Sequence, residues 1–166
     1  MRWFKALTPR ADRDSPEVEV RRRLSEIDQL FGSYRKPQEF VSPDHCEECR
    51  EHNETLLKHT VKSISLAELG TPTWDPICFT SMEGLRYYMP ALARLSLGSG
   101  DEYYLSSFIS HLSPKTRLNS FTLEEREVLS RFLESLWALR AEEIESSSDS
   151  DRLAKLIGRL KNQKPA

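Results

Sequence analysis

Apolar residues recur along most of this chain at intervals of three and four positions, which is the spacing of amphipathic helices. The clearest series follows Thr122 and Glu125, which are spaced as a capping box. It consists of Val128, Leu129, Phe132, Leu133, Leu136 and Trp137. A second series, Val20, Leu24, Ile27 and Phe31, follows the helix-start signal Ser-Pro-Glu at 15–17 and stops at Gly32. No segment shows the alternation of a strand. The pattern predicts an all-α fold.

Start and stop signals predict the helices between these two. Ser42-Pro43-Asp44 repeats the first start signal and predicts a helix from Cys46 to about Val61. Ser65 and Glu68 predict one short turn that ends at Gly70. A capping box at Thr80 and Glu83 introduces a central, largely buried helix that ends near 97. Pro90 lies inside it and is expected to kink or divide it. A further helix is expected within 101–112.

The composition changes over the last 21 residues, 146–166. Residues 146–152 are mostly serine and aspartate and predict a polar linker. Leu153, Leu156, Ile157 and Leu160 then form a short amphipathic series, followed by a basic end with Lys161 and Lys164. This helix either docks on the bundle, which we favour because an exposed apolar stripe promotes aggregation, or binds a partner as a detachable element.

These segments together predict a compact single-domain bundle of about six helices. The helical domain would span 1–145, with 1–14 as an irregular N-terminal arm. The linker would span 146–152, and 153–166 would form the C-terminal amphipathic helix and basic tail.

Composition narrows the function classes. The chain has 166 residues, 38% of them hydrophobic, and a net charge of -2, so no overall positive field favours nucleic acid or anionic lipid. Residues 1–10 lack the apolar core of a signal peptide, and no apolar run approaches the roughly 18 residues of a membrane span. We therefore expect a soluble, cytoplasmic protein whose three cysteines are reduced.

One run has the composition of a metal site. It is DHCEECREH at 44–52, and four metal-binding side chains in it, His45, Cys46, Cys49 and His52, lie on one side of a single helix at about 100° per residue. Imidazole and thiolate are preferred ligands of zinc. One helix supplies two or three ligands more easily than four, so closure would need Cys78, His59, His111 or a carboxylate from elsewhere.

Two other interpretations of this run remain open. A Cys-x-x-Cys motif at a helix N-terminus favours thiol exchange, but Glu47 and Glu48 oppose the lowering of the thiol pKa and no βαβ pattern surrounds the motif. Alternatively, a cysteine fills a core gap and the histidines are ordinary polar groups, as His59 and His111 are expected to be. Tyr87, Tyr88, Phe108 and Trp137 are interpreted as core aromatics. No complete catalytic motif occurs.

Three stretches together resemble a bacterial family of helical proteins that is known only as a domain of unknown function. They are DHCEECREH at 44–52, TWDPICFTSMEGLRYYMPALARL at 73–95 and FTLEEREVLSRFLESL at 121–136. The resemblance covers about two-thirds of the chain. It implies that Cys46, Cys49, Trp74, Tyr87, Tyr88 and Pro90 belong to one recurring design, and it favours a metal site. That family has no established activity to transfer.

The favoured function is a non-enzymatic helical accessory or protein-interaction module with a structural zinc site. Its expected ligands are His45, Cys46, Cys49 and His52, with Cys78 as an additional candidate. The rival is a metal- or thiol-dependent enzyme whose site lies open beside Cys46 and Cys49, near Tyr87, Tyr88 and Asp75. A protein partner is expected, and nucleic acid and membrane are not.

Overall fold

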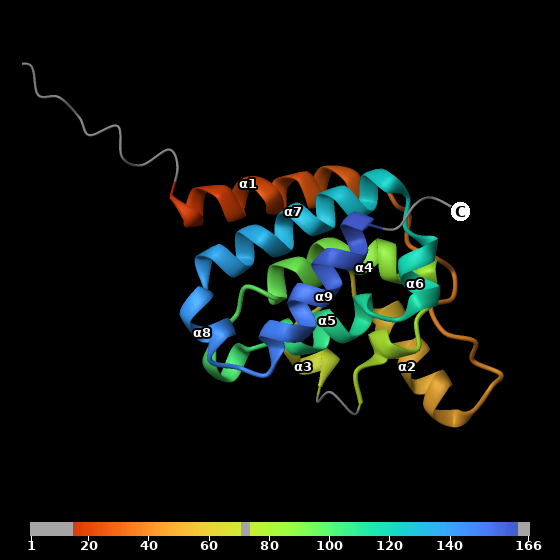
Figure 1. Ribbon diagram of the computed structural model, residues 1–166. Coiled ribbons are helices and arrows are strands. Elements are labelled where there is room, and N and C mark those ends of the chain that lie inside the picture. Colours follow the sequence, from red (N-terminus) through yellow and green to blue (C-terminus); the bar gives the residue numbers. More distant parts are fainter. Residues whose placement is uncertain (1–14, 71–73, 163–166) are drawn as a thin grey trace, which may run out of the picture.

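The computed structural model describes residues 15–70 and 74–162, and within them it contains helices, turns and loops but no strand (Figure 1). The predicted all-α fold is confirmed. The predicted arm at 1–14 lies outside the described residues, as does Lys164. In chain order the elements are α1 (Pro16–Phe31), α2 (Glu47–Lys58), α3 (Leu66–Leu69), η2 (Pro76–Cys78, a 3₁₀ turn), α4 (Met82–Leu95), η3 (Gly100–Glu102, also 3₁₀), α5 (Leu105–Leu112), α6 (Lys115–Ser120), α7 (Leu123–Leu139), α8 (Ala141–Glu145) and α9 (Asp149–Asn162).

Helices α1 and α7 lie side by side and antiparallel, with α4 against α1 (Figure 1). Their apolar stripes form the centre of the core, where Ile27, Phe31, Leu85, Phe132 and Leu133 have no exposed surface. The lower half of Figure 1 holds α2 and α3. None of the described helices is long and apolar enough to cross a membrane.

Helix α9 docks on α7 and α5, with Leu153, Leu156 and Leu160 almost fully buried. Its first residue, Asp149, is 3% exposed and accepts hydrogen bonds from the Tyr103 hydroxyl at 2.7 Å and from Ser106. The helix therefore begins four residues before the predicted start at 153. Asp149 anchors the start of α9 to Tyr103 and Ser106, and only 146–148 remain between α8 and α9.

Other boundaries also differ from the sequence-based expectations. Ser81, not Thr80, is the N-cap of α4, because the Thr80 hydroxyl donates instead to the Phe40 carbonyl. Helix α4 continues through Pro90. Pro90 and its neighbours Met89 and Ala91 are all buried, so core packing offsets the backbone hydrogen bond that proline cannot donate. The described residues hold nine α-helices rather than about six because three of them, α3, α6 and α8, are only four to six residues long.

The segment at Phe40 and Val41 connects α2 to the start of α4. The Asn53 side-chain oxygen on α2 accepts both backbone N–H groups, at 2.8 and 3.2 Å. The Ser81 N–H donates to the Phe40 carbonyl at 2.8 Å. Gly84 lies against the Phe40 ring, where a Cβ would be only 2.7 Å from a ring carbon. These contacts fix the chain that leads into the Cys46 region.

Candidate metal centre

Helix α2 begins with a cysteine as its cap. Cys46 has extended backbone angles, and its sulfur accepts the Cys49 N–H at 3.3 Å. The helix thus begins at Glu47, one residue after the predicted start at Cys46, and ends at Lys58, three residues before the predicted end at Val61, but its cap is Cys46 and not the Ser42-Pro43-Asp44 signal. His45 and Cys46 precede the helix, whereas Cys49 lies in its first turn. This change brings the three side chains to the positively polarised end of α2.

Among the described residues, one group of possible ligand atoms could hold a metal ion: His45, Cys46 and Cys49, whose donors all lie within 4.8 Å of one another. The two sulfurs are 3.0 Å apart, and the Cys49 sulfur is 3.4 Å from His45 Nδ1. Around one tetrahedral zinc ion, two sulfurs would lie about 3.8 Å apart, and a sulfur and an imidazole nitrogen about 3.5 Å apart. The sulfur–nitrogen distance at Cys49 thus already fits such an ion, and the two sulfurs would have to move apart by about 0.8 Å.

The two thiols have opposite pKa shifts. Hydrogen bonds from the Cys49 thiol and then from the Cys49 N–H lower the pKa of Cys46, and His45 adds to this effect. The pKa of Cys49 is raised, first by its hydrogen bond with Cys46 and then by burial, since the residue is only 7% exposed. Such a pair can release one proton readily, which suits metal binding and also thiol exchange.

The three donors open onto a pocket of about 430 Å³, whose other lining residues are Val41, Ser42, Glu48 and Phe79. His45 and Cys46 are exposed. The arrangement thus supplies three ligands and leaves one side of the group accessible, unlike a closed structural zinc site.

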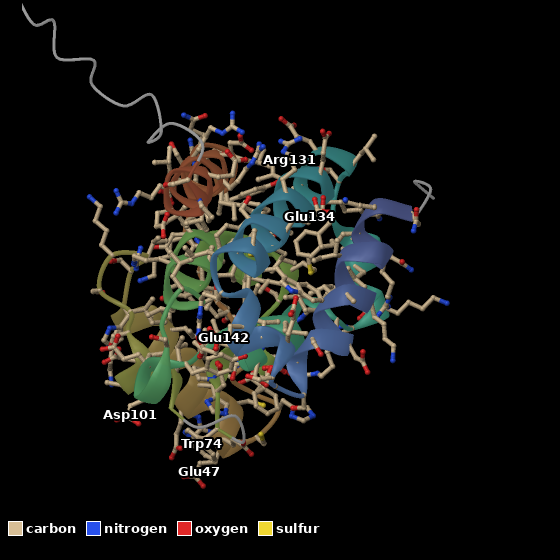
Figure 2. The ribbon with its side chains drawn as sticks, turned by 60° about the vertical axis from the view of Figure 1, so that its left-hand side comes forward. Glu47, Trp74, Asp101, Arg131, Glu134 and Glu142 are labelled. Carbon is tan, nitrogen blue, oxygen red and sulfur yellow. The ribbon has the colours of Figure 1, made fainter. Side chains whose placement is uncertain are left out.

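His52 is not brought into this group. Its ring stacks on Phe79 with centroids 4.9 Å apart and lies 4.8 Å from the Trp74 ring, and it is 2% exposed. Its Nε2 is 3.4 Å from a Glu48 oxygen. Figure 2 shows Trp74 at the same end of the molecule as Glu47, the first residue of α2. His52 is thus held as an aromatic packing group behind the pocket.

The other candidate ligands also lie elsewhere. His59 is the C-cap of α2, ten residues or about 15 Å along the helix from Cys49. Cys78 lies at the end of η2, where its sulfur is 3.9 Å from His111 Nδ1. His111 in turn contacts the Asp75 carboxylate at 2.8 Å. The sequence alone did not link these residues, because 33 or more positions separate His111 from Cys78 and from Asp75.

The tyrosines of the rival enzyme hypothesis are core residues. Tyr88 is fully buried, and its hydroxyl donates to the Leu56 carbonyl at 2.6 Å. Tyr87 is partly buried at the edge of the core, where it packs edge-on against Tyr88 and at a tilt against Phe40. Neither lines the pocket beside Cys46 and Cys49. Asp75 is buried and engaged by His111 and Tyr104.

Comparisons with known protein families, with curated protein sequences and with solved structures gave no match. The family resemblance of the sequence therefore stays a prediction, and any function must be argued from the site itself.

Proposed function

We propose that this chain is a non-enzymatic helical accessory module that binds one Zn²⁺ ion at His45, Cys46 and Cys49 and acts in the cytoplasm through a protein partner. The observation that carries the proposal is the convergence of two thiols and one imidazole at the start of α2. Zinc is the ion proposed because mixed sulfur and nitrogen ligands favour it over magnesium or calcium.

The ion would stabilise the start of α2 in addition to the Cys46 cap. Cys46 and His45 precede α2, and Cys49 lies within it. One ion bound to all three would fasten the incoming chain to the helix, and part of its binding free energy would become folding free energy. The ion would also hold α2 in place against the core, because three residues of this helix are buried there: Cys49, Asn53 and Leu56.

Exposed aromatic residues beside the site support a protein partner. Trp74 is 47% exposed and Phe79 is 46% exposed, and both contact the His52 ring. Large aromatic side chains are enriched at the centres of protein interfaces. A partner that covers them would also reach the open side of the ligand group.

Metal content tests the proposal. The full chain, purified with reductant and without chelator, is expected to retain about one zinc ion per molecule by elemental mass spectrometry. Cys46→Ala and Cys49→Ala are expected to lose it. Cys78→Ala and His52→Ala are matched controls that keep it. Wild-type protein that remains metal-free after incubation with zinc contradicts the proposal.

A metal-dependent enzyme is the second candidate, and the accessible side of the ligand group favours it. A zinc ion with three protein ligands can hold a water molecule and lower its pKa. Cobalt substitution separates the two candidates. Absorption bands that shift on addition of azide indicate an exchangeable fourth position, and bands that do not shift indicate closed coordination.

A further inference from the structure

A second cluster of reactive side chains lies outside the metal centre, between η2 and α5. The Cys78 sulfur is 3.9 Å from His111 Nδ1, and the other ring nitrogen of His111 is 2.8 Å from Asp75 Oδ2. We call Cys78, His111 and Asp75 the thiol relay. A nucleophilic side chain is commonly activated by a neighbouring base, which a carboxylate in turn orients, and these three residues lie in that order.

Hydrogen bonding assigns the proton positions in the relay. Tyr104 donates its hydroxyl proton to Asp75 Oδ2 at 2.7 Å. Its pKa is raised, mainly by burial and then by the Asp75 charge, so Tyr104 keeps that proton. Asp75 therefore acts as the acceptor, and His111 Nε2 as a donor to it. In the tautomer that carries its proton on Nε2, the ring presents Nδ1 as an acceptor to the Cys78 thiol, as a general base requires.

The supporting residues are rigidly held, whereas the thiol is accessible. Asp75 is 1% exposed and His111 is 2% exposed, but Cys78 lies on the surface. Asp75 Oδ1 also accepts the Ile77 N–H at 2.9 Å, which ties the carboxylate to the turn that carries Cys78. The relay thus combines a fixed base with a nucleophile that a solute can reach.

The Arg117 guanidinium from α6 fastens the two sides of the relay. It donates to the carbonyls of Ile77, Cys78 and Thr80 at 2.8 to 3.1 Å and to the His111 carbonyl at 3.1 Å. One cation therefore joins the end of η2 to the end of α5. None of these hydrogen bonds involves His45, Cys46 or Cys49, although Phe79, the residue after Cys78, lines their pocket.

The charged and titratable groups that face Cys78 are Asp75, His111 and Arg117, with Tyr104 behind them. Burial and then the Asp75 charge raise the pKa of the Cys78 thiol, and Arg117 opposes them. The resting thiol is therefore protonated near neutral pH. Without a proton acceptor it would be a poor nucleophile, because the thiolate is the reactive form.

We propose that Cys78 is a site of covalent addition for soft carbon electrophiles of the α,β-unsaturated carbonyl class, with His111 as its general base. In the addition, the Cys78 sulfur bonds to the β-carbon and the carbon–carbon π bond breaks. The thiol proton passes to His111 Nδ1 and then to the α-carbon. Atoms and electrons balance without an oxidant or a leaving group.

The surrounding backbone favours this electrophile class over esters. Attack on an ester needs donors for a developing oxyanion. The N–H groups of Cys78, Phe79 and Thr80 already donate within the turn, to the carbonyls of Asp75, Pro76 and Ile77. An α,β-unsaturated carbonyl places its developing charge away from the attacked carbon, so it needs no such donors beside the sulfur.

N-ethylmaleimide, an α,β-unsaturated imide, tests the relay on the full chain. The rate of Cys78 modification is read by peptide mass spectrometry, with Cys46 in the same sample as an internal reference. At about pH 7, His111→Gln is expected to slow Cys78 at least tenfold. Asp75→Asn is expected to slow it as well, because an amide donor would impose the wrong tautomer on His111. His59→Gln is the control that leaves the rate unchanged.

A rate within twofold of wild type in folded His111→Gln overturns the proposal. The wild-type pH profile provides a readout that does not depend on whether the variants fold. A thiol paired with an imidazole reacts at a nearly level rate between about pH 7 and pH 8. An unassisted thiol with a raised pKa gains about tenfold over that interval, and this result also overturns the proposal.

Discussion

At the scale of single residues, Cys46 has two separable roles. Its sulfur accepts the Cys49 N–H as the cap of α2, and it is also one of three possible metal ligands. Most caps use an oxygen atom, which is a weaker ligand for soft metals than a thiolate. The residue therefore offers a way to separate helix capping from metal binding.

Cys46→Ser and Cys46→Ala are expected to differ in stability but not in metal content. Serine retains a capping acceptor, so the metal-free variant should unfold with a free energy close to that of the metal-free wild type. Alanine removes the acceptor and should cost about 1 kcal/mol. Both variants should fail to retain zinc. Urea unfolding in the presence of a chelator gives the comparison, and equal stability of the two variants would rule out the capping role.

Sequence reasoning proposed four ligands from one helix, and the structure brings three of them together, without His52. The 100° rotation per residue placed His52 beside Cys49, but rotation about one helix carries no information on what packs against it. Phe79 stacks on the His52 ring, and Trp74 packs against that ring at a tilt. The relay was missed for a related reason. Cys78 and His111 meet only through the packing of η2 and α5, 33 residues apart in the chain.

At the scale of elements, two of the three predicted capping boxes form. They are Ser65 with Glu68 and Thr122 with Glu125. The third failed because the Thr80 hydroxyl bonds the Phe40 carbonyl, which left Ser81 to cap α4. That competing acceptor lies 40 residues away and could not be inferred from spacing.

Gly84→Ala is expected to destabilise the protein, although alanine favours helices. A Cβ at this position would lie 2.1 Å from the Thr80 hydroxyl oxygen and 2.7 Å from a Phe40 ring carbon. The resulting shift at the start of α4 should cost about 1 to 2 kcal/mol in urea unfolding. Gly158→Ala in α9 is the matched control, since a Cβ there has no neighbour within 4 Å. Gly158→Ala should raise the free energy of unfolding by about 0.5 to 1 kcal/mol. Similar effects of the two changes would mean that the contact with Phe40 is easily relieved.

At the scale of the whole molecule, Glu125 joins three helical segments. The residue is 1% exposed and lies on α7. It accepts from Arg86 Nε on α4 at 2.7 Å and from the Tyr34 hydroxyl, just after α1, at 2.6 Å. Burial alone would raise the pKa of this carboxyl, but the hydrogen bonds from Arg86, Tyr34 and the Thr122 N–H outweigh it and lower the pKa.

Glu125→Gln should destabilise the protein by about 3 kcal/mol near neutral pH, because it leaves the Arg86 charge without its partner. The carboxylate contributes stability above the unfolded-state pKa of about 4.5 and loses it as the pH falls toward the lower folded-state pKa. The difference between wild type and variant should therefore shrink when unfolding is measured below about pH 4. Glu127→Gln is the control: its ion pair with Arg131 is exposed and should matter by less than about 0.5 kcal/mol. A difference that does not change with pH would contradict the assignment.

The docking of α9 also belongs to this scale. Lys161 pairs with Glu134 of α7, and Arg159 donates to the Ser113 carbonyl at 2.9 Å. Figure 2 shows Glu134 on the α7 side that faces α9. The apolar series predicted docking as the favoured alternative, whereas the surrounding polar contacts depend on tertiary partners that the series did not reveal.

The Arg117 contacts have a consequence for how this protein can change over time. One guanidinium fixes the Cys78 turn to the His111 helix through backbone carbonyls, and none of these contacts uses a side chain of His45, Cys46 or Cys49. Substitutions at Cys78 or His111 would leave these contacts available, since Arg117 binds the backbone carbonyls of both residues and not their side chains.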